Sequence, residues 1–225
     1  MSERIAFIQE QFKAMGNPVK VAQFQKYLKT TQPMYGINAG PRKDILALSI
    51  KKYPIKNFED YLNFVQELWT ATNRELQYCA IDTAVKFKKF HLISAWSLFE
   101  RMALSAKWWD LADGIAVNLV GSLLLKNRSI QYILDDWMCN SDLWVRRISL
   151  LAHLKHKNQT HTDNLSRTII TLTVDKQFFI QKAIGWSLRE YSKTDARWVL
   201  KFIDEHGESL SNLAIREGTK YLNKL

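Results

Sequence analysis

Apolar residues recur at every third or fourth position along most of the chain, in segments of about 12–18 residues that short polar breaks separate. This period predicts amphipathic helices, and no alternating strand pattern competes with it. Two segments also begin with typical helix starts: Gly40-Pro41 places a proline in a first turn, and Asn57 precedes Phe58. The predicted helices cover residues 2–15, 20–30, 41–52, 58–71, 73–89, 92–104, 108–126, 130–139, 142–156, 162–174, 177–192, 196–205 and 211–222.

The composition agrees with an all-α fold. Only 8 glycines and 4 prolines occur among 225 residues, which is too few turn residues for a protein with many strands. A hydrophobic content of 47% with 24% charged residues is typical of a globular domain, and the length allows a substantial core.

A repeat of one helical hairpin runs through the second part of the chain. The equivalent positions are Cys79, Asp113, Arg147, Lys182 and Glu217, spaced by 34, 34, 35 and 35 residues. Such a hairpin buries its apolar face only by stacking on its neighbours. We therefore predict a HEAT-like solenoid of antiparallel hairpins with a basic concave face, as a single domain over 1–225 with a helical cap at 1–70 and regular repeats at 71–225. The alternative is an all-α protein whose short loops produce a similar spacing without a true repeat.

The formal net charge of +10 favours a polyanionic partner, nucleic acid first, although many basic proteins are charged only for solubility. Two cysteines, Cys79 and Cys139, form neither a disulfide framework nor a zinc motif, which indicates the reducing cytoplasm. The first residues include acids and lack the apolar stretch of a secretory signal. The longest apolar run, 114–125, is shorter than the roughly 20 residues of a membrane span, so no membrane association is expected.

The repeat places one acid and two bases at the same height on successive hairpins: Asp113, Arg147 and Lys182. Trp109 lies four residues before Asp113, and Trp186 lies four residues after Lys182, so each indole shares a helical face with a charged group. A fixed carboxylate stabilises the electron-poor sugar that forms when a base departs, and it can orient the attacking water. Indole faces attract cations, and basic side chains bind phosphates. The grouping suits cleavage of a glycosidic bond.

Structural readings of the same residues stay open. Tryptophans at helical spacing more often pack in a core, as we expect for Trp108. An aspartate early in a helix complements the helix dipole, and Arg147 can pair with Asp113 as a structural salt bridge. Arg146, one position before the repeat register, belongs either on the rim of a DNA-binding groove or between hairpins, and the same holds for Tyr78.

Three stretches of the sequence resemble motifs of the AlkD family of bacterial DNA alkylation repair glycosylases. They are Lys107-Trp108-Trp109-Asp110-Leu111-Ala112-Asp113, Leu143-Trp144-Val145-Arg146-Arg147, and the long stretch from Phe178-Phe179-Ile180 through Gly185-Trp186-Ser187 to Ser192. The resemblance covers nearly the whole chain, including Tyr27-Leu28 and Met34-Tyr35-Gly36-Ile37.

This resemblance implies a monofunctional glycosylase of base excision repair that removes cationic N3- and N7-alkylated purines from duplex DNA, without a cofactor or metal and without a deep base pocket. It implies that Asp113 is the catalytic carboxylate, that Trp109 and Trp186 contact the lesion's sugar and backbone, and that Arg147 and Tyr27 contact DNA. Lys182 and Arg146 are further candidate DNA contacts, and a monomer is expected. The amino-terminal segments 32–37 and 40–44 depart from the family pattern, which leaves the range of lesions open.

Other features carry less chemistry. His153, His156 and His161 lie close in sequence, but lysines interleave with them and no cysteine or acid joins them, so we expect a solvated helix end rather than a metal site. Two alternatives to the glycosylase remain: a non-catalytic solenoid that binds bent, branched or damaged DNA, and a scaffold for protein interactions.

Overall fold

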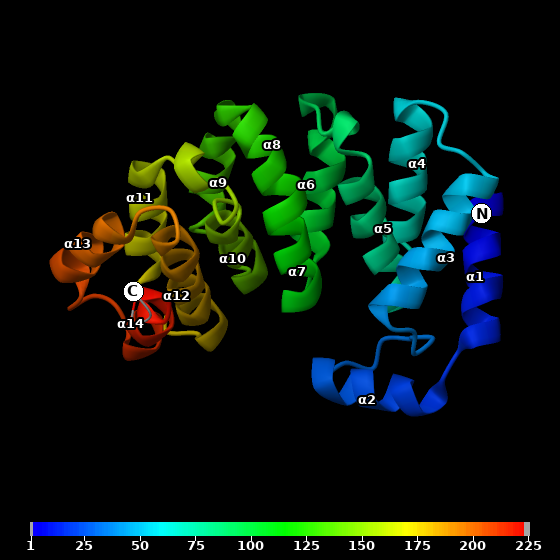
Figure 1. Cartoon of the computed structure of the whole chain (residues 1–225), viewed down its shortest axis with the longest axis horizontal. Coiled ribbons are helices and arrows are strands. Elements are labelled where there is room, and N and C mark those ends of the chain that lie inside the picture. The colour runs from blue at the N-terminus through cyan, green and yellow to red at the C-terminus, as the bar shows by residue number, and fades with distance from the viewer. Residues whose placement is uncertain (1, 223–225) are drawn as a thin grey trace. The chain divides into compact units, whose positions relative to one another are not determined.

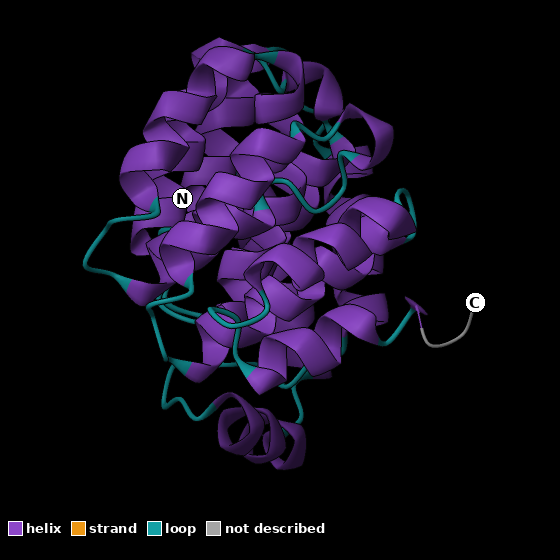
Figure 2. Ribbon diagram, turned by 90° about the vertical axis from the view of Figure 1, so that its left-hand side faces the viewer, coloured by secondary structure: helices purple, strands orange, loops and turns teal. Residues whose placement is uncertain are grey.

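The computed structural model describes residues 2–222, and the chain divides into two compact units, Met1–His91 and Leu92–Leu225. Helices joined by short loops make up both units, and the described residues contain no strand (Figure 2). The all-α helical-repeat prediction is therefore confirmed. The boundary between the units falls after the first predicted repeat hairpin, which belongs to unit 1 together with the predicted cap. No described helix is both long enough and apolar enough to cross a membrane.

Unit 1 contains the five helices α1 Glu3–Met15, α2 Pro18–Leu28, α3 Ala39–Lys52, α4 Phe58–Trp69 and α5 Arg74–Lys86 within its described part (Figure 1). Asn57 caps α4 as predicted, because its side chain accepts a hydrogen bond from the Asp60 amide at 2.9 Å. Helices α4 and α5 pack together, and fully buried Tyr61 and Phe64 of α4 belong to the core. Helix α2 differs from its neighbours, since Leu28 is its one buried residue.

Unit 2 contains α6 Trp96–Ser105, α7 Trp109–Ile115, α8 Gly121–Lys126, α9 Gln131–Trp137, α10 Leu143–Leu151, α11 Thr162–Leu172, α12 Phe178–Ser192, α13 Ala196–His206 and α14 Asn212–Thr219. The second helices of successive hairpins form a row, because α7 packs on α10, α10 on α12, and α12 on α14 (Figure 1). A row of this kind is the expected outcome when each hairpin covers the apolar face of the next one.

A π-helical turn, Ala116–Val120, joins α7 to α8, so the predicted helix 108–126 is continuous in space but widened in its middle. The Asn118 amide there donates to the Gly114 carbonyl at 3.0 Å. Helix α8 then begins at Gly121, where an added Cβ would lie 2.3 Å from the Ala152 carbonyl oxygen. The close approach of α8 to the end of α10 therefore requires glycine at this position.

The remaining predicted helices are confirmed, with ends that differ by a few residues. The largest difference is at 142–156, where α10 ends at Leu151 and the following residues turn inward. Leu154 and His156 in this turn are buried. The chain leaves the helix at this point and still contributes to the core.

Candidate functional site

Asp113 lies one turn inside α7, and 17% of its side-chain surface is exposed to solvent. Arg147 of the next hairpin binds both carboxylate oxygens: Nε donates to Oδ1 at 2.7 Å, and Nη2 donates to Oδ2 at 2.9 Å. A two-point contact between planar groups fixes both orientations. The salt bridge between Asp113 and Arg147, which was the structural alternative for these two residues, is present, and it leaves the carboxylate partly open to solvent.

Arg147 is itself held on its far side. Its side chain is 6% exposed, and Nη1 donates to the backbone carbonyl of Phe179, at the start of α12. Three of its five N–H groups are thus directed at Asp113 and Phe179, which ties three successive hairpins together. Phe179 is not among the site residues predicted from the sequence. The pair of adjacent aromatic residues at the start of α12 was the available signal.

An aromatic cluster of Trp108, Trp144 and Phe179 lies next to this ion pair. The Trp108 ring lies 5.2 Å from that of Trp144 and 5.6 Å from that of Phe179, while Trp144 and Phe179 are 5.0 Å apart, all between ring centroids. Aromatic pairs in edge-on and tilted arrangements add rigidity as well as buried area. Trp108 packs between hairpins, as its sequence position predicted.

Trp109 and Trp186 are both half-buried. Trp109 and Asp113 occupy positions i and i+4 of α7, so they share one helical face. On α12, Phe179, Lys182 and Trp186 follow at i, i+3 and i+7, which is a single stripe along the helix. Phe179, the first residue of that stripe, accepts a hydrogen bond from Arg147 through its backbone carbonyl. Trp186 lies about two helical turns after Phe179 on the same face of α12.

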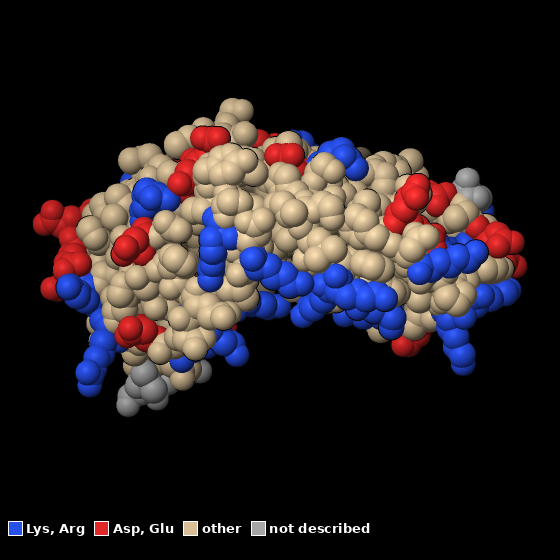
Figure 3. All heavy atoms as spheres, turned by 90° about the horizontal axis from the view of Figure 1, so that it is seen from above, with Lys and Arg blue, Asp and Glu red and all other residues tan. Residues whose placement is uncertain are grey.

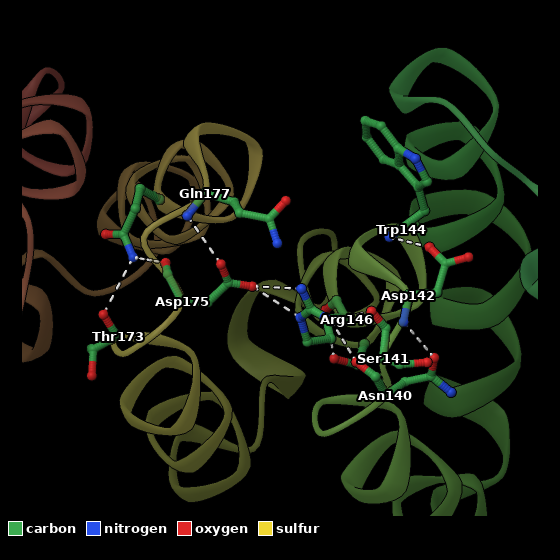
Figure 4. Close-up of polar contacts among 10 residues, drawn as sticks. Asn140, Ser141, Asp142, Trp144, Arg146, Thr173, Asp175 and Gln177 are labelled. Carbon is green, nitrogen blue, oxygen red and sulfur yellow. Dashed lines mark hydrogen bonds and ion pairs between the residues drawn. The ribbon is translucent and has the colours of Figure 1, made fainter.

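The two further basic candidates differ in their surroundings. Lys182 is exposed, and its ammonium lies 5.5 Å from the centre of the Phe178 ring; within the described residues, no ion pair joins it to Asp113. Arg146 is largely enclosed: it binds Asp175 at 2.9 Å and donates to the carbonyls of Asn140 and Ser141 (Figure 4). Of the two alternatives for Arg146, these contacts favour packing between hairpins.

Tyr27 belongs to unit 1, at the end of α2, with 71% of its surface exposed. Tyr78, also in unit 1, is covered by the Arg42 guanidinium, 4.7 Å from its ring centre, and Arg42 in turn binds Asp82 at 2.9 Å. Lysine and arginine side chains cluster on the surface of both units, whereas acidic side chains are more scattered over the same view (Figure 3).

The prediction of a solvated helix end at the three histidines is wrong for two of them. His153 and His156 are 3% and 4% exposed, and the His156 Nε2–H donates to the Gly121 carbonyl at 2.8 Å. Burial lowers the pKa of both imidazoles, that of His153 to about 3. Only His161 is exposed. Within residues 2–222, no group of three potential metal ligands occurs.

Comparison with known proteins agrees with this architecture. A family model described as DNA alkylation repair enzyme matches residues 8–222. The chain belongs to the DNA alkylation repair enzyme family. A solved structure described as a predicted DNA alkylation repair enzyme from Enterococcus faecalis is similar, with a TM-score of 0.83 and 33% sequence identity over 93% of this chain and 98% of that one. No curated protein matches the chain.

Membership in the DNA alkylation repair enzyme family makes DNA the partner and alkylation damage the target of the activity. The match spans both units, including Tyr27 and the aromatic and charged residues around Asp113. The net charge of +10 suits this partner, because each neutralised phosphate releases condensed counterions.

Proposed function

We propose that this protein is a DNA glycosylase that hydrolyses the N-glycosidic bond of cationic N3- and N7-alkylated purines, such as 3-methyladenine and 7-methylguanine, in duplex DNA. One observation carries the proposal. The Asp113 carboxylate is held by two hydrogen bonds from Arg147, remains 17% exposed, and lies one helical turn from the Trp109 indole. An oriented, partly open carboxylate beside an aromatic face suits a sugar that becomes positively charged.

The chemistry needs few groups. An alkylated purine already carries a positive charge, so when the bond from C1′ to the base nitrogen breaks, both electrons pass to the base and neutralise it. The sugar becomes oxocarbenium-like, and the carboxylate of Asp113 stabilises that charge. Asp113 orients a water molecule and accepts its proton as the oxygen bonds to C1′. The products are a neutral free base and an abasic site, and no cofactor or metal enters the balance.

The remaining residues position the DNA. Arg147 acts as a positioning residue for Asp113, because its side chain is 6% exposed and three of its N–H groups are directed at Asp113 and the Phe179 carbonyl. Trp109 and Trp186 contact the lesion's sugar and backbone, and the exposed Lys182 and Tyr27 contact phosphates. Arg146 is better placed to hold the hairpins together.

The test is release of free bases from methylated duplex DNA by purified protein. We expect wild-type protein to release 7-methylguanine and 3-methyladenine. Asp113→Asn removes the negative charge and keeps nearly the same shape, so we expect release to fall by about 100-fold or more while DNA binding persists. Asp204→Asn, an exposed acid on α13, provides the matched control and should release bases at the wild-type rate.

The outcome also separates the glycosylase from a non-catalytic DNA binder. A binder without catalysis retains affinity for damaged or bent DNA and yields no free base at any enzyme concentration. Equal release by wild-type and Asp113→Asn would remove Asp113 from its role, and absence of release at saturating enzyme would remove the glycosylase itself.

A further inference from the structure

In unit 1, the loop between α2 and α3, residues 29–38, is bound to one buried carboxylate in the first turn of α5. Glu75 is 2% exposed, and its Oε1 accepts hydrogen bonds from the backbone N–H groups of Tyr35 at 3.0 Å, Gly36 at 2.8 Å and Ile37 at 3.3 Å. Consecutive N–H groups that converge on one anion form a nest. Within residues 2–222, Oε2 of Glu75 has no hydrogen-bond partner, so the three loop amides supply the hydrogen bonds of this buried carboxylate.

The nest is in direct contact with the beginning of α2. Gly36 has a φ of +79°, which favours glycine, and an added Cβ there would lie 2.3 Å from the Asn17 carbonyl oxygen. Asn17 caps α2, because its side chain accepts a hydrogen bond from the Lys20 amide at 3.1 Å. The Asn17 N–H donates to the Tyr35 carbonyl at 2.8 Å. A change in the nest is therefore transmitted to the first turn of α2.

The other end of α2 is attached to the same loop. The Gln25 side-chain amide donates to the Gln32 carbonyl at 3.0 Å, and the Thr30 N–H donates to the Gln25 carbonyl at 3.1 Å. The Gln32 side chain in turn accepts a hydrogen bond from Arg74, the residue before Glu75, at 2.7 Å. Both ends of α2 are thus held by the 29–38 loop, and that loop is held by the first turn of α5.

Packing of apolar side chains contributes little to the placement of α2. Leu28 is the one buried residue of this helix, whereas α4 of the same unit has five. Since helices in proteins are held mainly by packing of an apolar face, the hydrogen bonds of the 29–38 loop take over this task for α2. The helix contains two lysines, Lys20 and Lys26, and no acid, and Tyr27 near its end is 71% exposed. Its surface suits a polyanion.

We propose that Glu75 is a positioning residue for DNA binding: it holds the 29–38 loop, and through that loop it places α2 so that Tyr27 and Lys26 meet the phosphate backbone. This inference rests on the proposed function, in which Tyr27 contacts DNA. Glu75 itself does not touch the nucleic acid, because its carboxylate is enclosed. Its effect is on the affinity for DNA and not on the chemistry at Asp113, which belongs to unit 2.

The test is the affinity of full-length Glu75→Gln protein for an undamaged duplex oligonucleotide, measured by fluorescence anisotropy. Glutamine keeps the shape and removes the charge that strengthens the three hydrogen bonds, so we expect about tenfold weaker binding. The matched control is Glu59→Gln, which removes an exposed acid from the first turn of α4. Each substitution raises the net charge by one, which by itself strengthens binding to DNA. Equal affinities of the two variants would overturn the proposal.

Two further variants show whether Glu75 acts through α2. Tyr27→Ala should weaken DNA binding, and Glu75→Gln should add little to that loss, because both changes remove the same contact. Fully additive losses would show that Glu75 acts elsewhere and would refute the assignment. Gln25→Ala leaves the nest intact and removes only the attachment of α2 to the Gln32 carbonyl, so it tests the proposal even where Glu75→Gln does not fold. We expect about threefold weaker binding for Gln25→Ala, and wild-type affinity in this variant would contradict the proposal.

Base release distinguishes this inference from the glycosylase activity. Single-turnover release of 7-methylguanine from saturated complexes should be the same for Glu75→Gln and wild-type protein, since Asp113 and its partners belong to unit 2. A slower release with unchanged DNA affinity would contradict a positioning role through α2. Absence of release by every variant would remove the glycosylase, and the affinities for the undamaged duplex would still decide the role of Glu75.

Discussion

At the scale of single residues, the geometry of one guanidinium decides how Asp113 is presented. Arg147 has a planar fork of donors that matches both carboxylate oxygens and still reaches the Phe179 carbonyl. A lysine would keep the positive charge and lose this match, because an ammonium is a single point of charge on a flexible chain. Replacing Arg147 by lysine therefore separates the effect of its positive charge from its effect on the orientation of Asp113.

Arg147→Lys should reduce base release by about 100-fold, the effect expected from a small misplacement of a catalytic group. Since Arg147 positions Asp113, the loss should appear in the single-turnover rate, and affinity for a duplex with a non-cleavable abasic analogue should change little. The matched control is Arg167→Lys, which alters an arginine bound to Asp135 at 2.7 Å on a more exposed surface. A loss confined to DNA affinity would instead identify Arg147 as a phosphate contact.

At the scale of helices, the π-helical turn after α7 is maintained by close backbone contacts. Gly121 has ordinary helical dihedral angles, φ −63° and ψ −39°, so its requirement for glycine is purely steric. An added Cβ would lie 2.3 Å from the Ala152 carbonyl oxygen and 3.0 Å from that of Ala116. Both are backbone atoms, which cannot rotate away as a side chain can.

Gly121→Ala should therefore destabilise unit 2 by about 1–3 kcal/mol, although glycine to alanine in an open helix usually stabilises a protein. Urea unfolding followed by tryptophan emission measures this unit selectively, because Trp69 is the one tryptophan of unit 1 among eight. Gly218→Ala is the control: an added Cβ there would lie 3.1 Å from the Leu188 Cβ, a much longer distance than the 2.3 Å contact at Gly121, so a smaller loss is expected. Equal urea midpoints for the two variants would contradict this prediction, because they would show that α8 can move away from the end of α10 without a loss in the free energy of unfolding.

The helices themselves follow from the period of apolar residues, and the pairing of Asp113 with Arg147 follows from a register of 34 residues between them. Other contacts depend on backbone atoms, which a side-chain pattern does not reveal. The Phe179 carbonyl that binds Arg147 is one example, and the widened turn at Ala116–Val120 is another. The histidines after Leu151 were misplaced because periodicity does not show which turn residues the next hairpin covers.

At the scale of the whole molecule, buried histidines link stability to pH. The pKa of His153 falls from 6.5 to about 3 in the folded chain, chiefly through burial, and that of His156 is lowered as well. Between these two values the unfolded chain binds a proton that the folded chain does not bind. The contribution of these histidines to the free energy of unfolding is therefore fully present above about pH 7, and it decreases as pH falls through 6.5, the ordinary histidine pKa.

Each such histidine contributes up to about 1.4 kcal/mol of lost stability per pH unit below its unfolded value. The window from pH 6.5 to 5 isolates this effect, because carboxylates titrate mainly below it. Urea midpoints measured there in phosphate-free buffer should decline for wild-type protein and decline less steeply for His153→Gln, which cannot take up the proton. His161→Gln, at an exposed position, should follow the wild-type slope. If His153→Gln also follows that slope, His153 takes up a proton in the folded chain, and burial of its ring is not the cause of the pH dependence.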